Sequence, residues 1–197
     1  MDTLEELMAR IEKAFDGVTL EDGVGLHETL GLDDRLSPEQ CAALREEDEK
    51  HDWRKIPLID LYRYGSCLSY FDAKGMRFHL PRILLYDLGA DAEEEERLFR
   101  EGLVAHLDSP DVHFALTHQN DKWPDRFDHY FSALNAEQIQ CVISYLELYR
   151  DSAEEIYAEI MAKSIMHEDV RAIEKALPVW RARLCAVSSM AVPQTDR

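Results

Sequence analysis

Apolar residues recur at helical spacing near both ends of the chain. At the amino end they follow the capping-box pair Thr3 and Glu6, which predicts a helix over about residues 4–15. A second capping box at residues 135–138 precedes the longest periodic run, in which four apolar residues stand seven apart: Ile139, Leu146, Ala153 and Ile160. This run predicts a long helix, and a last helix is expected over about residues 167–186.

Helix starts are also visible in the first half of the chain. Ser37 and Pro38 supply an N-cap and a first-turn proline, which predict a helix over about residues 38–51. A shorter helix is expected near residues 58–64. The acidic residues 91–96 favour a further helix start, because carboxylates there meet the positive end of the helix dipole.

Two short apolar-rich segments flank a glycine-containing turn and favour strands. Residues 67–71 and 76–80 flank the turn-forming residues 72–75, and together they predict a β-hairpin. A short strand is also expected over residues 112–116.

These elements predict an α+β fold in which helices dominate. We expect a small antiparallel β-hairpin packed on helices and a long C-terminal helical hairpin. A chain of 197 residues can form one domain with an appended extension. Residues 1–150 are expected to be the α+β core domain, and residues 151–197 a C-terminal helical extension with a polar tail.

Acidic residues outnumber basic ones by a wide margin. The chain has 40 Asp and Glu against 22 Lys and Arg, a formal net charge of -18 and a pI near 4.7. Phosphate backbones require a basic surface, so this balance argues against nucleic-acid binding. It is typical of a protein that docks on a basic partner, and equally of a chain whose surplus carboxylates only keep it in solution.

Several common site types have no counterpart in the sequence. The amino end lacks a secretory signal and no window approaches about 18 consecutive apolar residues, so we expect a cytoplasmic chain without a membrane partner. The four cysteines form no C-x-x-C pair. His27-Glu28 opens like a zinc-protease motif, but Gly31 stands where the second histidine is required. We therefore expect no catalytic motif, no metal and no cofactor.

Acidic side chains cluster near the end of the helix predicted over residues 38–51. Asp48, Glu49 and Asp52 could hold a hard divalent cation, with a nitrogen ligand from His51 or His79. The alternative is a solvated helix end whose carboxylates pair with the basic residues nearby: Arg45, Lys50, Arg54 and Lys55.

The predicted hairpin carries a second candidate site. Arg77 and His79 would point to the same face, where Asp48 or Asp52 could join them to bind a carboxylate or to shuttle a proton. The alternative is a buried salt bridge that pins the hairpin to the preceding helix. Trp53 is expected to pack in the core rather than to form a stacking platform.

The densest negative patch of the sequence is a run of four glutamates: Glu93, Glu94, Glu95 and Glu96. Such a run is most often a solvated helix start. Exposed carboxylates of this kind are also what a basic protein surface would dock against.

The middle of the chain resembles a bacterial family of uncharacterised proteins. The resemblance rests on segments at residues 11–15, 22–26, 45–53, 71–81 and 134–138, of which Asp72-Ala73-Lys74-Gly75-Met76-Arg77-Phe78-His79-Leu80-Pro81 is the most specific. It covers roughly residues 10–150 and implies a common fold, with no activity attached.

These observations favour a binding protein over an enzyme. The first hypothesis is an acidic protein that docks on a basic protein surface, most concretely an immunity protein that neutralises a cognate bacterial toxin. A second is an enzyme or metal-binding domain, and a third is a self-associating structural protein that uses the heptad-like face of the long helix. For the first, the expected contact residues are Glu93, Glu94, Glu95, Glu96, Asp48, Glu49 and Asp52; for the second, the site residues are Asp48, Glu49, Asp52, Arg77 and His79.

Overall fold

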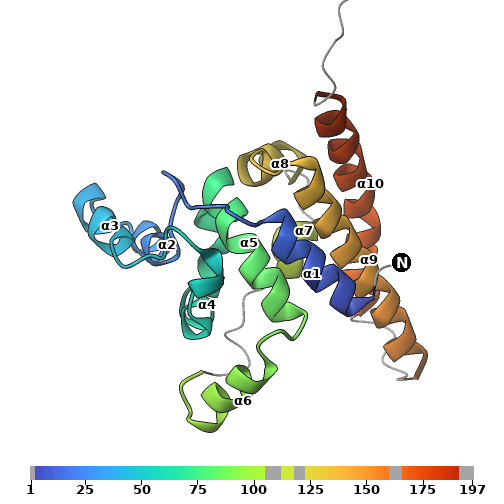
Figure 1. Cartoon of the computed structure of the whole chain (residues 1–197), viewed down its shortest axis with the longest axis horizontal. Coiled ribbons are helices and arrows are strands. Elements are labelled where there is room, and N and C mark those ends of the chain that lie inside the picture. Colours follow the sequence, from blue (N-terminus) through green and yellow to red (C-terminus); the bar gives the residue numbers. More distant parts are fainter. Residues whose placement is uncertain (1–2, 105–111, 118–122, 160–165, 191–197) are drawn as a thin grey trace, which may run out of the picture. The chain divides into compact units, whose positions relative to one another are not determined.

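The computed structural model describes residues 3–104, 112–117, 123–159 and 166–190, and every regular element in these ranges is a helix (Figure 1). The α-helices are α1 (Leu4–Ala14), α2 (Leu26–Asp33), α3 (Pro38–Arg45), α4 (Leu58–Tyr64), α5 (Ala73–Asp87), α6 (Ala92–Arg100), α7 (Val112–Thr117), α8 (Trp123–Phe131), α9 (Ala136–Glu159) and α10 (Met166–Met190). Two short 3-10 helices, η1 (Trp53–Lys55) and η2 (Gly65–Tyr70), flank α4. The expected α+β class is wrong, because the described residues contain no strand.

The helices sort into two compact units. One unit contains α1, α9 and α10, and the other contains α2 to α6 together with α8, while α7 is divided between them. None of the helices in the described ranges has both the length and the apolar surface that crossing a membrane would require.

In the first unit, α9 packs against both α1 and α10 (Figure 1). Its start is the predicted capping box: the Asn135 N–H donates to the Gln138 side chain at 3.1 Å, and the Gln138 N–H donates back at 2.9 Å. The Gln138 amide also donates to the Ala14 carbonyl at 3.1 Å, which joins α9 to the end of α1. The helices predicted at both ends of the chain are therefore confirmed.

The heptad-like face of α9 is only partly described. Ile139 and Leu146 are fully buried within the structure. The side chain of Ala153, residue Ile160 and the predicted polar tail at residues 191–197 lie outside the described parts of the chain.

In the second unit, the predicted β-hairpin is replaced by η2 and α5. Asp72, expected in the hairpin turn, is the N-cap of α5, and its carboxylate accepts the Gly75 N–H at 2.8 Å. Between residues 76 and 86 every side chain except Arg77 is buried. A helix buried on all sides has no polar face, so the period of 3.6 residues disappears from its sequence.

Without the hairpin, Arg77 and His79 do not point to the same face, contrary to the prediction from the sequence. Arg77 and His79 are two residues apart on one helix, which places their side chains about 200° apart around its axis. The strand expected over residues 112–116 is wrong as well, since these residues form α7. A six-residue segment is too short for its hydrophobic pattern to separate a strand from a buried helix.

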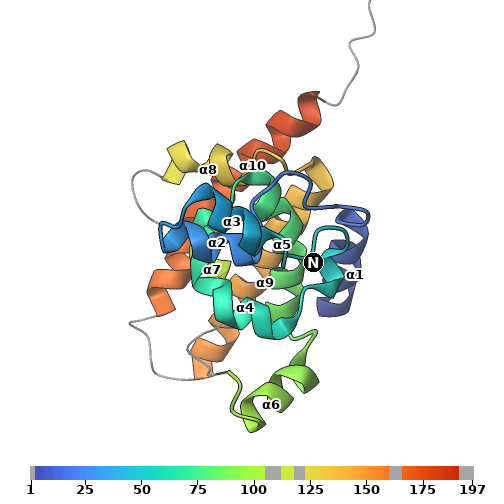
Figure 2. The ribbon, with the colours of Figure 1, turned by 90° about the vertical axis from the view of Figure 1, so that its left-hand side faces the viewer.

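Two further elements pack against α5 in the second unit, namely α8 and η1. In η1, the Trp53 ring is buried and its indole N–H donates to the Phe15 carbonyl at 2.9 Å. Trp53 thus belongs to the core, as the sequence predicted. Figure 2 looks onto the side of this unit that carries α2, α3 and α4, where the candidate site lies.

Candidate functional site

The glycine-rich turn before α2 lies unusually close to two other segments. A Cβ on Gly23 would lie 2.6 Å from the Gly75 amide nitrogen, and a Cβ on Gly25 would lie 1.8 Å from Asp48 Oδ2. Only glycine allows the backbone to approach other atoms this closely. The Val24 N–H between them donates to the Asp72 carboxylate at 3.0 Å, which ties the turn to the start of α5.

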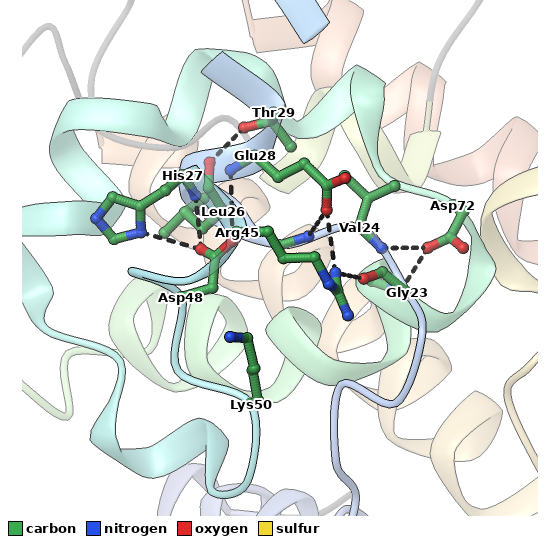
Figure 3. Close-up of polar contacts among 12 residues, drawn as sticks. Gly23, Val24, Leu26, His27, Glu28, Thr29, Arg45, Asp48, Lys50 and Asp72 are labelled. Atoms are coloured by element: carbon green, nitrogen blue, oxygen red, sulfur yellow. Dashed lines mark hydrogen bonds and ion pairs between the residues drawn. The ribbon is translucent and has the colours of Figure 1, made fainter. Parts of the chain in front are cut away.

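Asp48 binds the amino end of α2 (Figure 3). The helix α3 ends at Arg45, sooner than the sequence predicted, and the following turn brings Asp48 to α2. Asp48 Oδ1 accepts the His27 N–H at 2.7 Å, and Oδ2 accepts the Glu28 N–H at 3.4 Å. The carboxylate thereby satisfies first-turn N–H groups and meets the positive end of the helix dipole. Its side chain is 1% exposed, and this burial raises the pKa of Asp48 although the hydrogen bonds from His27 and Glu28 lower it.

Arg45 fixes the same turn from the other side. Its guanidinium donates to the Glu28 carboxylate at 3.0 Å and to the Gly23 carbonyl (Figure 3). It also donates to the Glu21 carbonyl at 2.8 Å. Glu28 in turn accepts the Gly25 N–H at 3.2 Å. The turn, the first turn of α2 and the end of α3 therefore form one hydrogen-bonded assembly.

His27 lies between two carboxylates. Its Nδ1 is 2.9 Å from Asp48 Oδ1, and its Nε2 is 3.9 Å from Asp60 Oδ2, in the first turn of α4. The ring also packs on Tyr64, with ring centroids 4.7 Å apart. A carboxylate on Nδ1 orients an imidazole and selects the tautomer whose Nε2 can accept a proton.

A cavity of about 220 Å³ opens beside His27. Its apolar wall consists of Leu26, Ile56 and Pro57. Its polar lining holds four carboxylates and two imidazoles, from Glu47, Asp48, Glu49, Asp60, His27 and His79. Lys55 also lines the cavity, but its ammonium lies 3.5 Å from Asp52 and its side chain is 69% exposed. The pocket therefore presents mainly hydrogen-bond acceptors and negative charge.

His79 contributes a buried acceptor to this lining. The residue is 1% exposed, its Nδ1 donates to the Gly75 carbonyl at 2.7 Å, and its ring stacks on Phe71 with centroids 4.4 Å apart. Burial lowers the pKa of His79 to about 4, so the ring is neutral at neutral pH. With the proton on Nδ1, Nε2 is an acceptor, and it has no hydrogen-bond partner among the described residues.

The structure brings together only some of the predicted site residues. Asp48, Glu49 and His79 meet at the pocket. Asp52 lies instead at the start of η1, where it accepts the Arg54 N–H at 3.2 Å. Arg77 forms an ion pair with Glu21. The Arg77 and His79 pairing expected on one hairpin face is therefore wrong.

Glu49 has a structural role within the turn that follows α3. Its Oε1 accepts the N–H groups of Lys50, His51 and Asp52 at 3.0, 2.8 and 3.1 Å. These bonds, led by the one from His51, lower the pKa of Glu49. Asp52, by contrast, fits the predicted solvated pairing, because it lies within 4 Å of both Arg54 and Lys55.

The four glutamates of α6 do not form a uniform patch. Glu94 pairs with Arg97, and the Glu95 carboxylate accepts a hydrogen bond from the Tyr86 hydroxyl at 2.9 Å and another from Tyr62. Glu93 and Glu96 are exposed. Half of the predicted docking run therefore has partners within its own unit.

Three residues of the pocket were missed by reasoning from the sequence: His27, Asp60 and Glu47. In the sequence, His27 stands out only as the first half of an incomplete zinc-protease motif. Its sequence neighbours give no sign that Asp48 and Asp60 would flank it, because these contacts span more than 20 residues. Within the described parts of the chain, no three His, Cys, Asp or Glu side chains converge to hold a metal ion.

Asp48→Asn should lower the free energy of unfolding by about 2 kcal/mol, because an amide cannot accept from all the groups that the charged carboxylate serves. Urea unfolding measures the change. Glu47→Gln, one residue earlier and exposed, is the matched control and should leave the midpoint unchanged. Equal losses in both variants would show that Asp48 does not hold the start of α2.

Comparison with known proteins places this assembly within a family. A model described as "Family of unknown function (DUF6714)" matches residues 3–173, which includes the turn, the pocket and the first part of α10. No curated protein and no solved structure matches the chain. Because the family model covers most of its length, the chain belongs to this family of unknown function.

Proposed function

We propose that the chain is an acidic binding protein that docks on a basic protein surface through the side carrying α2, α3 and α4. Its most concrete form is an immunity protein that neutralises a cognate bacterial toxin. The observation that carries the proposal is the gathering of Glu47, Asp48, Glu49 and Asp60 around one cavity, in a chain whose net charge is -18. Complementary charge speeds encounter with a basic partner and selects against acidic ones.

The pocket side is a better docking surface than α6. Of the α6 glutamates, Glu94 and Glu95 already have partners, so a partner protein would compete with Arg97 and with two tyrosine hydroxyls for them. In the pocket, the Asp60 carboxylate lies 3.9 Å from His27 Nε2, which is beyond hydrogen-bond distance. Asp60 therefore retains acceptors that a basic side chain can use.

Affinity capture on the immobilised full chain tests the proposal. A native lysate is loaded at about 50 mM salt and eluted with a step to about 300 mM, since exposed charges are screened over that range. The expected result is one dominant basic protein that salt releases and whose activity the chain inhibits. No basic protein in the eluate, or capture that salt does not weaken, would contradict docking by charge.

Two variants with the same change of charge locate the docking surface. Glu47→Lys alters the pocket rim and Glu93→Lys alters α6, and both residues are exposed. We expect Glu47→Lys to slow association about tenfold and Glu93→Lys to slow it less than about threefold. Slower association in Glu93→Lys alone would move the docking surface to α6.

The His27 environment favours a second candidate function, general acid–base catalysis on a small cationic substrate. The carboxylate of Asp48 on Nδ1 orients the imidazole, as it does in acid–base pairs. This candidate requires turnover that His27→Gln abolishes while the circular dichroism spectrum shows that the variant remains folded. Full activity in His27→Gln would exclude the imidazole as the proton acceptor.

A further inference from the structure

We propose that the cavity beside His27 binds a guanidinium group, supplied by an arginine side chain of the docked partner. The identity of the source rests on the proposed function, whereas the chemistry of the site rests on the pocket itself.

Two carboxylates, one inside the cavity and one at its rim, would neutralise the charge of the guanidinium group. Asp60 lines the cavity with its side chain 13% exposed, and its carboxylate oxygens can accept hydrogen bonds, because His27 Nε2 at 3.9 Å is too far to donate to them. Glu47 lines the same cavity and is exposed, which places its charge at the rim. Guanidinium binds carboxylates through charge-assisted and often bidentate hydrogen bonds.

His79 supplies an independent reason to expect a donor ligand. The residue lines the cavity and is 1% exposed, and its Nδ1 is already used by the Gly75 carbonyl. With Nδ1 donating to Gly75, Nε2 is left as an acceptor that a donor ligand in the cavity can use. An N–H of the ligand can satisfy Nε2, whereas a carboxylate or phosphate would repel both the lone pair and the surrounding charges.

Size and shape favour an arginine side chain. A cavity of about 220 Å³ is smaller than the pockets of about 300–1,000 Å³ that hold drug-sized ligands. The apolar wall formed by Leu26, Ile56 and Pro57 suits the methylene stem of a basic residue. A planar guanidinium has five N–H donors in fixed directions, which suits a cavity with several acceptors, whereas an ammonium has three donors at a single point.

Lys55 does not already fill this role. Its ammonium lies 3.5 Å from Asp52, in an ion pair, and its side chain is 69% exposed. Lys55 therefore leaves the Asp60 and Glu47 carboxylates of the cavity available to a ligand from outside.

Nuclear magnetic resonance on the full chain at low salt tests the inference. The probe is N-acetyl-arginine N-methylamide, and the signals followed are the imidazole protons of His27 and His79 and the backbone amides of residues 26, 48 and 60. We expect saturable shifts at these positions with a Kd on the order of 1 mM. N-acetyl-citrulline N-methylamide, which has nearly the same shape without the charge, should leave them in place.

Substitutions at the two carboxylates test which groups bind the probe. Asp60→Asn should weaken arginine binding about tenfold, while Asp34→Asn, an exposed carboxylate at the other end of α2, should change it less than about twofold. If Asp60→Asn does not fold, Glu47→Gln serves instead, because its side chain is exposed, and a weakening of about threefold is expected.

Three results would overturn the inference: no shifts at the pocket, equal binding of the citrulline compound, or equal binding of N-acetyl-lysine N-methylamide. The capture experiment separates this failure from failure of the proposed function. A captured basic partner with no arginine binding would place docking elsewhere on the surface. Arginine binding without any captured protein would contradict the claim that a partner protein supplies the guanidinium group. The cavity would then be a site for a free guanidinium compound.

Discussion

Gly75→Ala should lower the free energy of unfolding by about 3 kcal/mol, although alanine is the better helix former. The added Cβ would lie 2.4 Å from the Val24 carbonyl oxygen and 3.0 Å from Asp72 Oδ1. The first of these atoms belongs to the backbone, so it can move away only if α5 and the turn before α2 separate. That separation would also break the hydrogen bond from the Val24 N–H to Asp72.

The same substitution elsewhere in a helix provides the control. A Cβ on Gly31, in α2, would meet Leu44 Cδ1 at 2.9 Å and Cys41 Sγ at 3.0 Å. These are the ends of side chains, which can rotate away, so Gly31→Ala should change the free energy of unfolding by less than about 1 kcal/mol. Urea unfolding compares the two variants. A Gly75→Ala protein as stable as the wild type would show that α5 does not depend on this contact.

Acidification from pH 6.5 to pH 4 should cost about 3 kcal/mol of stability through His79 alone. Burial lowers the pKa of His79 to about 4 in the folded chain, against 6.5 for an exposed histidine. Between these values the unfolded chain binds the proton and the folded chain does not, so stability falls as pH falls. The difference of about 2.5 pH units corresponds to about 3 kcal/mol, and the loss ends once folded His79 is protonated as well.

Neighbouring charged groups both raise and lower the pKa of His79. His27 and Arg45 disfavour the protonation of His79, whereas Asp72 favours it. Asp48 acts in the opposite direction on stability, because its raised pKa lets the folded chain take up a proton first as pH falls. The contribution of His79 must therefore be obtained by difference against a variant.

His79→Asn supplies that difference, because its amide can still donate to the Gly75 carbonyl but does not titrate. The free energy of unfolding, measured by urea at several pH values, should depend less on pH between 4 and 6.5 in this variant. His51→Asn, at an exposed histidine, is the matched control and should keep the wild-type slope. Parallel curves for the wild type and His79→Asn would contradict a buried neutral imidazole.

The candidate site could be predicted from the sequence only in part. The sequence predicts Asp48, Glu49 and His79 as site residues, and the pocket contains all three. Their roles depended on partners that the sequence does not place near them. The Asp48 carboxylate is bound by the backbone of α2 and by His27, across 20 and 21 residues of chain.

Local signals determined the elements whose stabilising contacts lie within a few residues. The capping boxes at Thr3, Ser37 and Asn135 each join groups three residues apart, and all three are present in the structure. Together with apolar residues at helical spacing, they fixed α1, α9 and the start of α3. The net charge of -18 is likewise a property of the sequence alone.

Tertiary structure decided the helical state of α5 and the composition of the pocket. Because α5 is buried on all sides, its sequence lacks the helical periodicity that would have identified it. The short alternation of apolar and polar residues within α5 therefore predicts a strand. The close approach at Gly25 and Gly75, and the meeting of Asp48, Asp60 and His79 beside His27, arise only when distant segments pack together. A linear sequence records which groups are available, and long-range packing determines which of them meet.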